Sequence, residues 1–104
     1  MSGQSFPEGL EINLYRILQE SLTNVRRHSG ARRVRVSLAV REASIVLEVA
    51  DDGKGPGESK PGLGRRGMAE RASMLGGAFH FGPGPTGGSL VSVTVPLFQK
   101  KGEK

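Results

Sequence analysis

The stretch SIVLEVADDGKG, residues 44–55, decides the fold because it joins an apolar strand to a turn rich in aspartate and glycine. Its first seven residues are mostly β-branched or aliphatic, which favours a strand. Just before it, aliphatic side chains alternate with polar or small ones, at Val34, Val36, Leu38 and Val40. This period of two predicts a half-buried strand. Because the polar link at residues 41–43 is short, the two strands are predicted to form an antiparallel hairpin.

Helical periods flank the hairpin on both sides. Upstream, a helix predicted to begin near Glu8 and stop at Gly30 carries one apolar stripe, made by Leu10, Leu14, Ile17, Leu18, Leu22 and Val25. Downstream, residues 51–66 contain two prolines and no apolar period, which predicts a loop. A short helix ending at residues 76–77 is then predicted from the spacing of Met68, Ala72 and Leu75. Residues 78–81 and 89–95 predict two further strands.

This order of elements indicates an α+β fold. We expect a two-layer α/β sandwich with the helices on one face of a mainly antiparallel mixed sheet. A length of 104 residues fits one domain. The predicted domain covers residues 10–98, with a disordered or fragment-like start at residues 1–9 and a disordered polar tail at residues 99–104.

Composition narrows the classes of ligand and of protein. Fifteen Lys and Arg against ten Asp and Glu give a net charge of +5, so an anionic partner is expected: nucleic acid, phospholipid or nucleotide. There is no cysteine and no run of 18 apolar residues. We therefore expect no thiolate metal site, no disulfide scaffold, no membrane span and no signal peptide. Twelve of the 16 glycines lie between residues 53 and 88, which points to turns and close approaches in that third of the chain.

The first group of residues that could carry chemistry lies on the long helix. Glu20, Asn24 and His28 recur every four residues and therefore share one face. Glu20 and Asn24 offer the oxygen ligands that a hard cation such as Mg²⁺ prefers. The alternative is an ordinary solvated flank of the helix.

The second group directly follows the apolar strand. Asp51 ends the strand as a fixed carboxylate, and Gly53 and Gly55 allow the backbone to turn and a ligand to lie against it. A carboxylate there can accept a hydrogen bond from an amine such as the adenine 6-amino group. The alternative is a simple Asp/Gly turn.

The third group is GLGRRG at residues 62–67, which runs into a helix. It lacks the preceding strand and the later acidic residue of a dinucleotide fingerprint, and the chain has no P-loop. Free backbone N–H groups at a helix start, with Arg65 and Arg66 beside them, still predict an anion site. The alternative is a mobile surface loop.

In this order, the three groups resemble the ATP-binding catalytic domain of sensor histidine kinases, a Bergerat-type fold shared with DNA gyrase. Residues 14–31 (LYRILQESLTNVRRHSGA) resemble the N box of that family, and residues 51–55 (DDGKG) resemble its first glycine box. Residues 62–77 (GLGRRGMAERASMLGG) resemble the second glycine box, and residues 87–96 (GGSLVSVTVP) the closing strand. The short loop and the G-M-x-E-R segment are most similar to the subgroup that contains nitrate-sensor kinases.

The resemblance implies ATP and Mg²⁺ as cofactors and assigns roles on the long helix. Asn24 would ligate Mg²⁺ through its side-chain oxygen. Glu20, one turn earlier, would act as a base or a metal-contacting group, which makes these two the catalytic candidates. Arg27 and His28 would lie near the phosphates.

The resemblance also implies the rest of the ATP site. Asp51 would bind the adenine amine, with Gly53 and Gly55 giving room, and Ser89, where the family usually has Thr, would bridge Asp51 and adenine through water. A lid over the triphosphate would use Gly62, Gly64 and Gly67, and the ATP-binding set further includes Leu63, Arg65, Arg66 and Met68. Arg65 stands where the subgroup often has Leu, which either weakens the packing of the lid or adds a phosphate contact.

The implied reaction is donation of the ATP γ-phosphate to a histidine on a separate dimerisation domain, with a response regulator downstream. Neither His28 nor His80 lies in the His-acid dipeptide of such acceptors. We expect a cytoplasmic domain with no direct membrane contact, any anchor of the parent kinase lying in other segments.

Three other interpretations compete with this one. Five arginines within ten residues suggest a nucleic-acid-binding module, although aromatic residues for base stacking are lacking there: Arg26, Arg27, Arg32, Arg33 and Arg35. We therefore expect no nucleic-acid partner. A serine-directed kinase on the same scaffold does not fit the subgroup motifs, and a purely structural α+β domain leaves the glycines unexplained.

Overall fold

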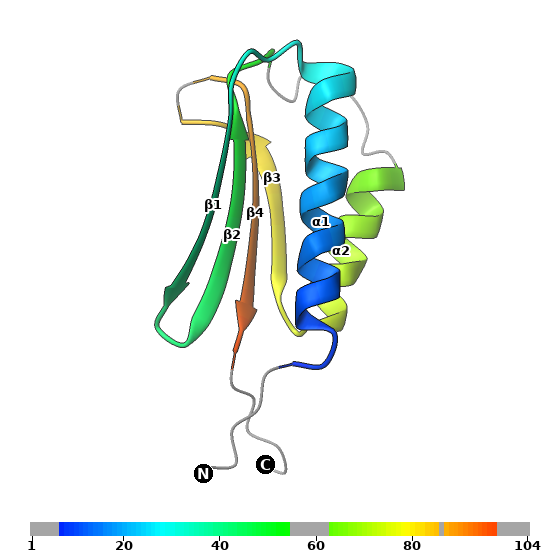
Figure 1. The fold of residues 1–104 in the computed structure, drawn as a ribbon, viewed down its shortest axis with the longest axis vertical. Helices are drawn as coiled ribbons and strands as arrows, with labels where there is room; N and C mark the ends of the chain where they lie inside the picture. Colours follow the sequence, from blue (N-terminus) through cyan, green and yellow to red (C-terminus); the bar gives the residue numbers. More distant parts are fainter. Residues whose placement is uncertain (1–6, 55–62, 86, 98–104) are drawn as a thin grey trace.

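The computed structural model describes residues 7–54, 63–85 and 87–97. They form two layers, a four-stranded sheet and a pair of helices that lies on one of its faces (Figure 1). The elements follow the order α1 (Leu10–Asn24), η1 (Val25–Ser29), β1 (Val34–Arg41), β2 (Ser44–Asp51), α2 (Leu63–Met74), β3 (Ala78–Pro83) and β4 (Ser89–Pro96). The predicted α+β sandwich is confirmed, and the boundaries expected for the two tails stay predictions.

The sheet has the order β1-β2-β4-β3, and each neighbouring pair is antiparallel. The expected mixed character is therefore not seen among the described strands. The β1–β2 hairpin turns at Glu42 and Ala43, which both have positive φ angles, 51° and 65°. Left-handed backbone at both central positions matches the right-handed twist of the flanking strands.

Strand alternation sends one row of each strand toward the helices. Opposite one another in the sheet stand Leu47 of β2 and Val93 of β4, with Phe79 of β3 next to Val93. These rows meet α1 over β2 and α2 over β3, and the two helices contact each other. The core buried between the layers consists of Leu10, Ile17, Leu47, Val49, Met68, Ala72, Leu75, Val91, Val93, Val95 and Leu97.

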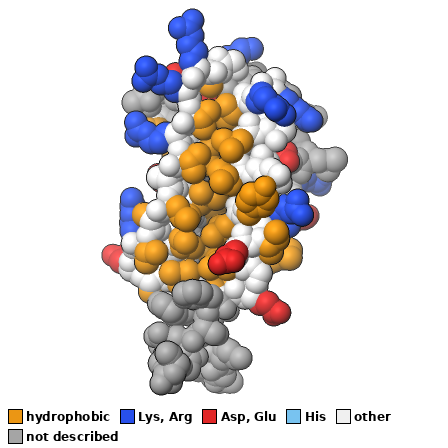
Figure 2. Space-filling model, viewed as in Figure 1, with side chains coloured by type: hydrophobic (Ala, Val, Ile, Leu, Met, Phe, Trp, Pro, Cys, Tyr) orange, Lys and Arg blue, Asp and Glu red, His pale blue; other side chains and the backbone are white. Residues whose placement is uncertain are grey.

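Strand β1 is not half-buried, so that part of the prediction is wrong. Its aliphatic row faces the helix side, since Leu38 pairs with the buried Leu47. However, Leu38 and Val40 remain 59% and 65% exposed. The reason is that β1 is the edge strand and the helices cover β2 and β3 instead. Figure 2 shows the resulting band of apolar side chains along one face of the molecule.

The helix ends differ in detail from the predictions. Helix α1 starts at Leu10 after Gly9, whose φ is +78°, and the following turn η1 stops before Gly30, whose φ is +66°. The predicted stop is confirmed. Helix α2 starts at Leu63, so the prediction that the preceding loop extends to residue 66 is wrong. Two arginines in that first turn are good helix formers, and they offset the low propensity of Gly64. Among the described residues, no helix is long and apolar enough to cross a membrane.

Candidate functional site

Four helices and strands have one of their termini at the same end of the molecule. Helix α1 and strand β2 finish there with Asn24 and Asp51, while β4 starts there with Ser89 (Figure 1). The first turn of α2 points toward the same end (Figure 1). The residues that sequence analysis singled out on separate segments are thereby collected on one side of the fold.

Asp51 is the last residue of β2 and belongs to the row that faces the helices. Its side chain is 8% exposed, and its Oδ1 accepts a hydrogen bond from the backbone N–H of Gly53 at 2.8 Å. Strand β4 runs alongside, and the register continues from the Ala50–Leu90 pair toward Asp51 and Ser89. Ser89 is equally buried, at 8%. This fixes a carboxylate and a hydroxyl at the rim of the core.

Gly88 makes this arrangement possible, and the sequence analysis did not single it out. A Cβ atom added to Gly88 would collide with the carbonyl oxygen of Asp51 and would stand 3.0 Å from Oδ1 of that residue. Its φ is also positive, +72°. Only glycine allows the chain entering β4 to pass this close to Asp51. The signal in the sequence was the Gly87-Gly88 pair directly before an apolar strand.

Asp52 has a different task from its neighbour. Its Oδ1 accepts hydrogen bonds from the backbone N–H groups of Arg32 and Arg33 at 2.9 and 3.0 Å. The bond from Arg33, then that from Arg32, lowers the pKa of the Asp52 carboxyl below its ordinary value of 3.8. The exposed Asp52 thus ties the segment before β1 to the end of β2.

Glu20 and Asn24 remain one turn apart on α1, and both side chains are half-buried. Past Asn24 the backbone widens into the π-helical turn η1. A π-turn has more residues per turn than an α-helix, so the spacing that grouped His28 with the other two holds only as far as Asn24. Arg27 in this turn is exposed. The side chain of His28 lies outside what the structure describes.

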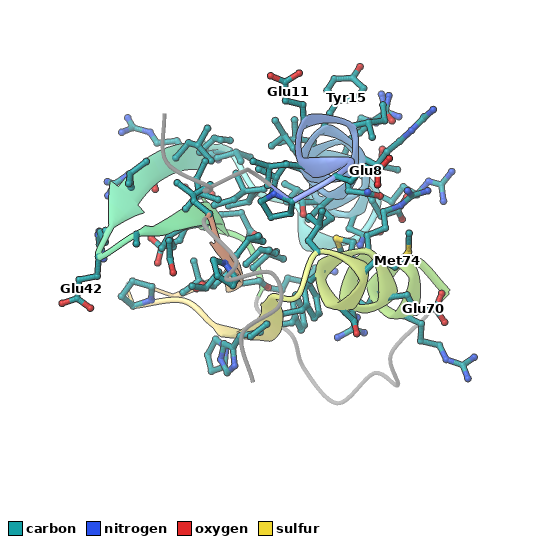
Figure 3. The ribbon with its side chains drawn as sticks, turned by 90° about the horizontal axis from the view of Figure 1, so that it is seen from below. Glu8, Glu11, Tyr15, Glu42, Glu70 and Met74 are labelled. Atoms are coloured by element: carbon teal, nitrogen blue, oxygen red, sulfur yellow. The ribbon has the colours of Figure 1, made fainter. Side chains whose placement is uncertain are left out.

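The described residues contain no cluster of three or more His, Cys, Asp or Glu that could hold a metal ion. Figure 3 agrees for the carboxylates that it labels, since Glu11 projects from the side of α1 away from α2, and Glu42 and Glu70 lie at opposite sides of the molecule. The described His, Asp and Glu side chains therefore do not by themselves form a set of three ligands for a divalent ion.

The first turn of α2 holds the arginines of the predicted anion site. The Arg65 guanidinium carbon lies 4.3 Å from the ring centroid of Phe81, whereas Arg66 is exposed. Met68 is 1% exposed and accepts a hydrogen bond at its Sδ from the Ser21 hydroxyl at 3.3 Å. Met68 therefore packs in the core, and its predicted part in ATP binding stays a prediction. Gly67 lies in the same helix.

Some predicted site residues fall outside the described part of the chain. These are Gly55 and Gly62, together with the side chain of Leu63 and the surroundings of Gly64. Their roles stay predictions.

Comparison with known proteins decides the family. Residues 9–99 match the family described as histidine kinase-, DNA gyrase B-, and HSP90-like ATPase. The chain belongs to this ATPase family. The match covers nearly the whole sequence and supports ATP binding, not the nucleic-acid-binding alternative.

Relatives within the family carry histidine kinase names. The chain is 36% identical over 98 residues to the signal transduction histidine-protein kinase/phosphatase DegS of Brevibacillus brevis, covering 91% of this chain and 25% of that protein. It is 39% identical over 100 residues to the sensor histidine kinase LiaS of Bacillus subtilis, covering 92% of this chain and 28% of that protein. The chain thus spans about a quarter of the length of these relatives.

Solved structures agree with the fold. The histidine kinase domain of the blue-light activated histidine kinase EL346 of Erythrobacter litoralis superposes with a TM-score of 0.69 at 26% identity, over 82% of this chain and 43% of that one. The ATP-binding domain of PrrB from Mycobacterium tuberculosis superposes with a TM-score of 0.73 at 24% identity, over 83% and 68%.

Proposed function

We propose that this ATPase-family domain binds Mg-ATP and serves as the catalytic domain of a sensor histidine kinase. In the parent protein it would donate the γ-phosphate to a histidine on a separate dimerisation domain, upstream of a response regulator. The observation that carries the proposal is the buried Asp51 at the end of β2, which lies at the same end of the fold as Asn24, Ser89 and the first turn of α2 (Figure 1).

Asp51 is suited to select adenine. One of its oxygens already accepts from Gly53, which fixes the carboxylate, and its remaining lone pairs can accept from the adenine 6-amino group. A carboxylate offers no donor, so it discriminates against a base that carries a carbonyl at that position. Ser89 next to it would hold a bridging water, and Gly53 and Gly55 would leave room for the ring.

The triphosphate would lie toward α2 and the end of α1. The positive end of the α2 helix dipole, together with the exposed Arg66 and Arg27, supplies positive potential there. Gly62, Gly64 and Gly67 would let the adjoining segment fold over the phosphates. Since phosphoryl transfer needs mainly positioning and charge stabilisation, these groups can serve it without a nucleophile in this domain.

Asn24 and Glu20 fit a magnesium site in their chemistry, because both present oxygen donors one turn apart on α1. The ion would take its other ligands from ATP and water, in keeping with the lack of a larger acidic cluster among the described residues. When bound, Mg²⁺ neutralises charge on the phosphates.

The partners follow from this role. The histidine-bearing domain and the response regulator would be contacted by the parent kinase, and the domain would work in the cytoplasm. Neither nucleic acid nor direct membrane contact is part of the proposal.

Calorimetric titration tests the nucleotide site. We expect the unmodified chain to bind ATP, more tightly with Mg²⁺ than without it. Asp51→Asn replaces an acceptor by a donor at the adenine amine and should weaken ATP binding roughly 10- to 150-fold, the worth of a hydrogen bond to a charged group. The matched control is Asp52→Asn, which makes the same chemical change one residue later on an exposed side chain. It should leave ATP affinity within about threefold of the unmodified chain.

Phosphotransfer is tested separately by adding histidine-bearing domains of related kinases and radiolabelled ATP. Acid-labile label on the acceptor histidine is the expected product. Absence of ATP binding in a folded sample would refute the proposal as a whole, whereas binding without transfer to any of several acceptors would refute only the kinase part.

A further inference from the structure

Arg65 occupies a position of the buried stripe of α2. Its spacing to Met68 and Ala72, i to i+3 and i+7, places the three on one side of the helix, and the last two are 1% and 0% exposed. A charged residue at such a position needs a partner. The neighbouring Arg66 lies about 100° further around the helix axis and is exposed. Arg65 therefore faces the core side of α2, whereas Arg66 faces solvent.

One partner of Arg65 is an aromatic ring on the helix-facing side of the sheet. Its guanidinium carbon lies 4.3 Å from the centroid of Phe81, within the range of a cation–π contact. Phe81 is half-buried in β3, stands opposite the buried Val91 of β4 and packs against the core. The ring is thus held by the sheet, and the arginine connects the first turn of α2 to it.

We infer that Arg65 is a positioning residue for the nucleotide site, a role that rests on the proposed function. Through Phe81 it holds the first turn of α2 against the sheet, and so it sets where Arg66 stands toward the phosphates. Arg65 itself does not contact phosphate. Direct contact with the triphosphate is left to its exposed neighbour.

The size of the effect is bounded by the contact. Without the Arg65–Phe81 contact, the first turn of α2 is less ordered in the free protein, and ATP must order it on binding. The loss of ATP affinity is then at most the free energy of that contact. For a cation–π contact that strength corresponds to about 2- to 30-fold in a binding constant. The loss should appear for ATP and not for adenosine, because only the phosphates meet α2.

Three substitutions separate anchoring from phosphate contact. Arg65→Ala should weaken ATP binding within the stated range. Arg65→Leu should restore most of the affinity lost in Arg65→Ala, because a leucine at this position of the stripe can also pack on Phe81. In contrast, Arg66→Ala should weaken ATP binding, and Arg66→Leu should not restore it, since a phosphate contact requires the charge.

A double-mutant cycle between Arg65→Ala and Phe81→Leu tests whether the ring carries the effect. If Arg65 acts through Phe81, the double variant should bind ATP about as well as the weaker single variant. In the unmodified chain, the Nε–H proton of Arg65 should show an upfield ring-current shift in NMR spectra that disappears in Phe81→Leu. Amide hydrogen exchange in the first turn of α2 should quicken in Arg65→Ala and return toward the original rate in Arg65→Leu.

The outcomes are distinguishable. If the unmodified chain binds no ATP, the proposed function fails and this role fails with it. If the chain binds ATP but Arg65→Leu is as weak as Arg65→Ala, or the cycle is additive, then Arg65 does not act through packing on Phe81, and the inference is overturned while the proposed function stands. A missing ring-current shift would also overturn it.

Discussion

The close approach of Gly88 to Asp51 yields a prediction whose size can be worked out from the structure. Replacing Gly88 by alanine adds a Cβ that collides with the Asp51 carbonyl oxygen, so the entry to β4 or the end of β2 must move. Overpacking of this kind costs about 1–3 kcal/mol. The left-handed backbone, at φ +72°, adds about 1–2 kcal/mol for any residue with a Cβ. The free energy of unfolding should therefore fall by roughly 2–5 kcal/mol.

Gly87→Ala is the matched control for this experiment. Gly87 also has a positive φ, +96°, but a Cβ added there meets nothing within 4 Å. It should lose only the backbone part, about 1–2 kcal/mol. Both variants can be compared by urea unfolding, where slopes of about 1–3 kcal/mol per molar convert the expected losses into clearly separated midpoints.

Nucleotide affinity provides the second readout of this pair. Because the collision involves Asp51 itself, Gly88→Ala should also weaken ATP binding in the fraction that remains folded, while Gly87→Ala should not. Equal unfolding midpoints for the two variants would refute the reasoning, since the close approach to Asp51 would then carry no energy.

Three other predictions concern stability. Because the pKa of Asp52 is lowered in the folded protein, its hydrogen bonds stabilise the fold at pH values above the ordinary carboxyl pKa of 3.8. This stabilisation is lost as the pH falls through the lowered pKa. In Asp52→Ala, the thermal unfolding midpoint should therefore depend less steeply on pH below about 4. Arg71 donates to the buried Asn13 side chain at 2.9 Å, so Arg71→Ala should cost about 1–3 kcal/mol in urea unfolding, against less than about 0.5 kcal/mol for the exposed neighbour Glu70→Ala. Gly67→Ala meets no atom within 4 Å inside α2 and should raise stability by about 0.5–1 kcal/mol; a loss of stability would show that α2 is not continuous through this residue.

Local patterns predicted the elements well because the periods were strong. The alternation of residues 34–40 and the stripe that includes Ile17 are direct consequences of strand and helix geometry. Asp51 was found for the same reason, since a carboxylate that directly follows a buried row must stand at the rim of the core. Helix stops were visible at Gly30 and Gly76, which both have positive φ.

What the sequence did not reveal depends on contacts between distant segments. The pattern of β1 is the same for a central strand and for an edge strand, so the exposure of Leu38 could not be foreseen without the pairing of β2 with β4. The start of α2 was misjudged because two glycines hid it, while a contact to Phe81, sixteen residues after Arg65, helps to hold its first turn. The role of Gly88 likewise appears only when Asp51 lies beside it.

Because side chains alternate between the two faces of a strand, the adjacent aspartates at the end of β2 have different roles. Asp51 continues the row of Leu47 and Val49, so it faces the helix layer and is buried, while Asp52 lies outside the strand and binds the backbone before β1. A slip of β2 by one residue would exchange the two carboxylates and expose the buried row. The pairs that fix the register, such as Val49 with Val91, therefore decide which carboxylate is available to a ligand. Substitutions that weaken this pairing should reduce nucleotide affinity through the position of Asp51, even though they touch no ligand.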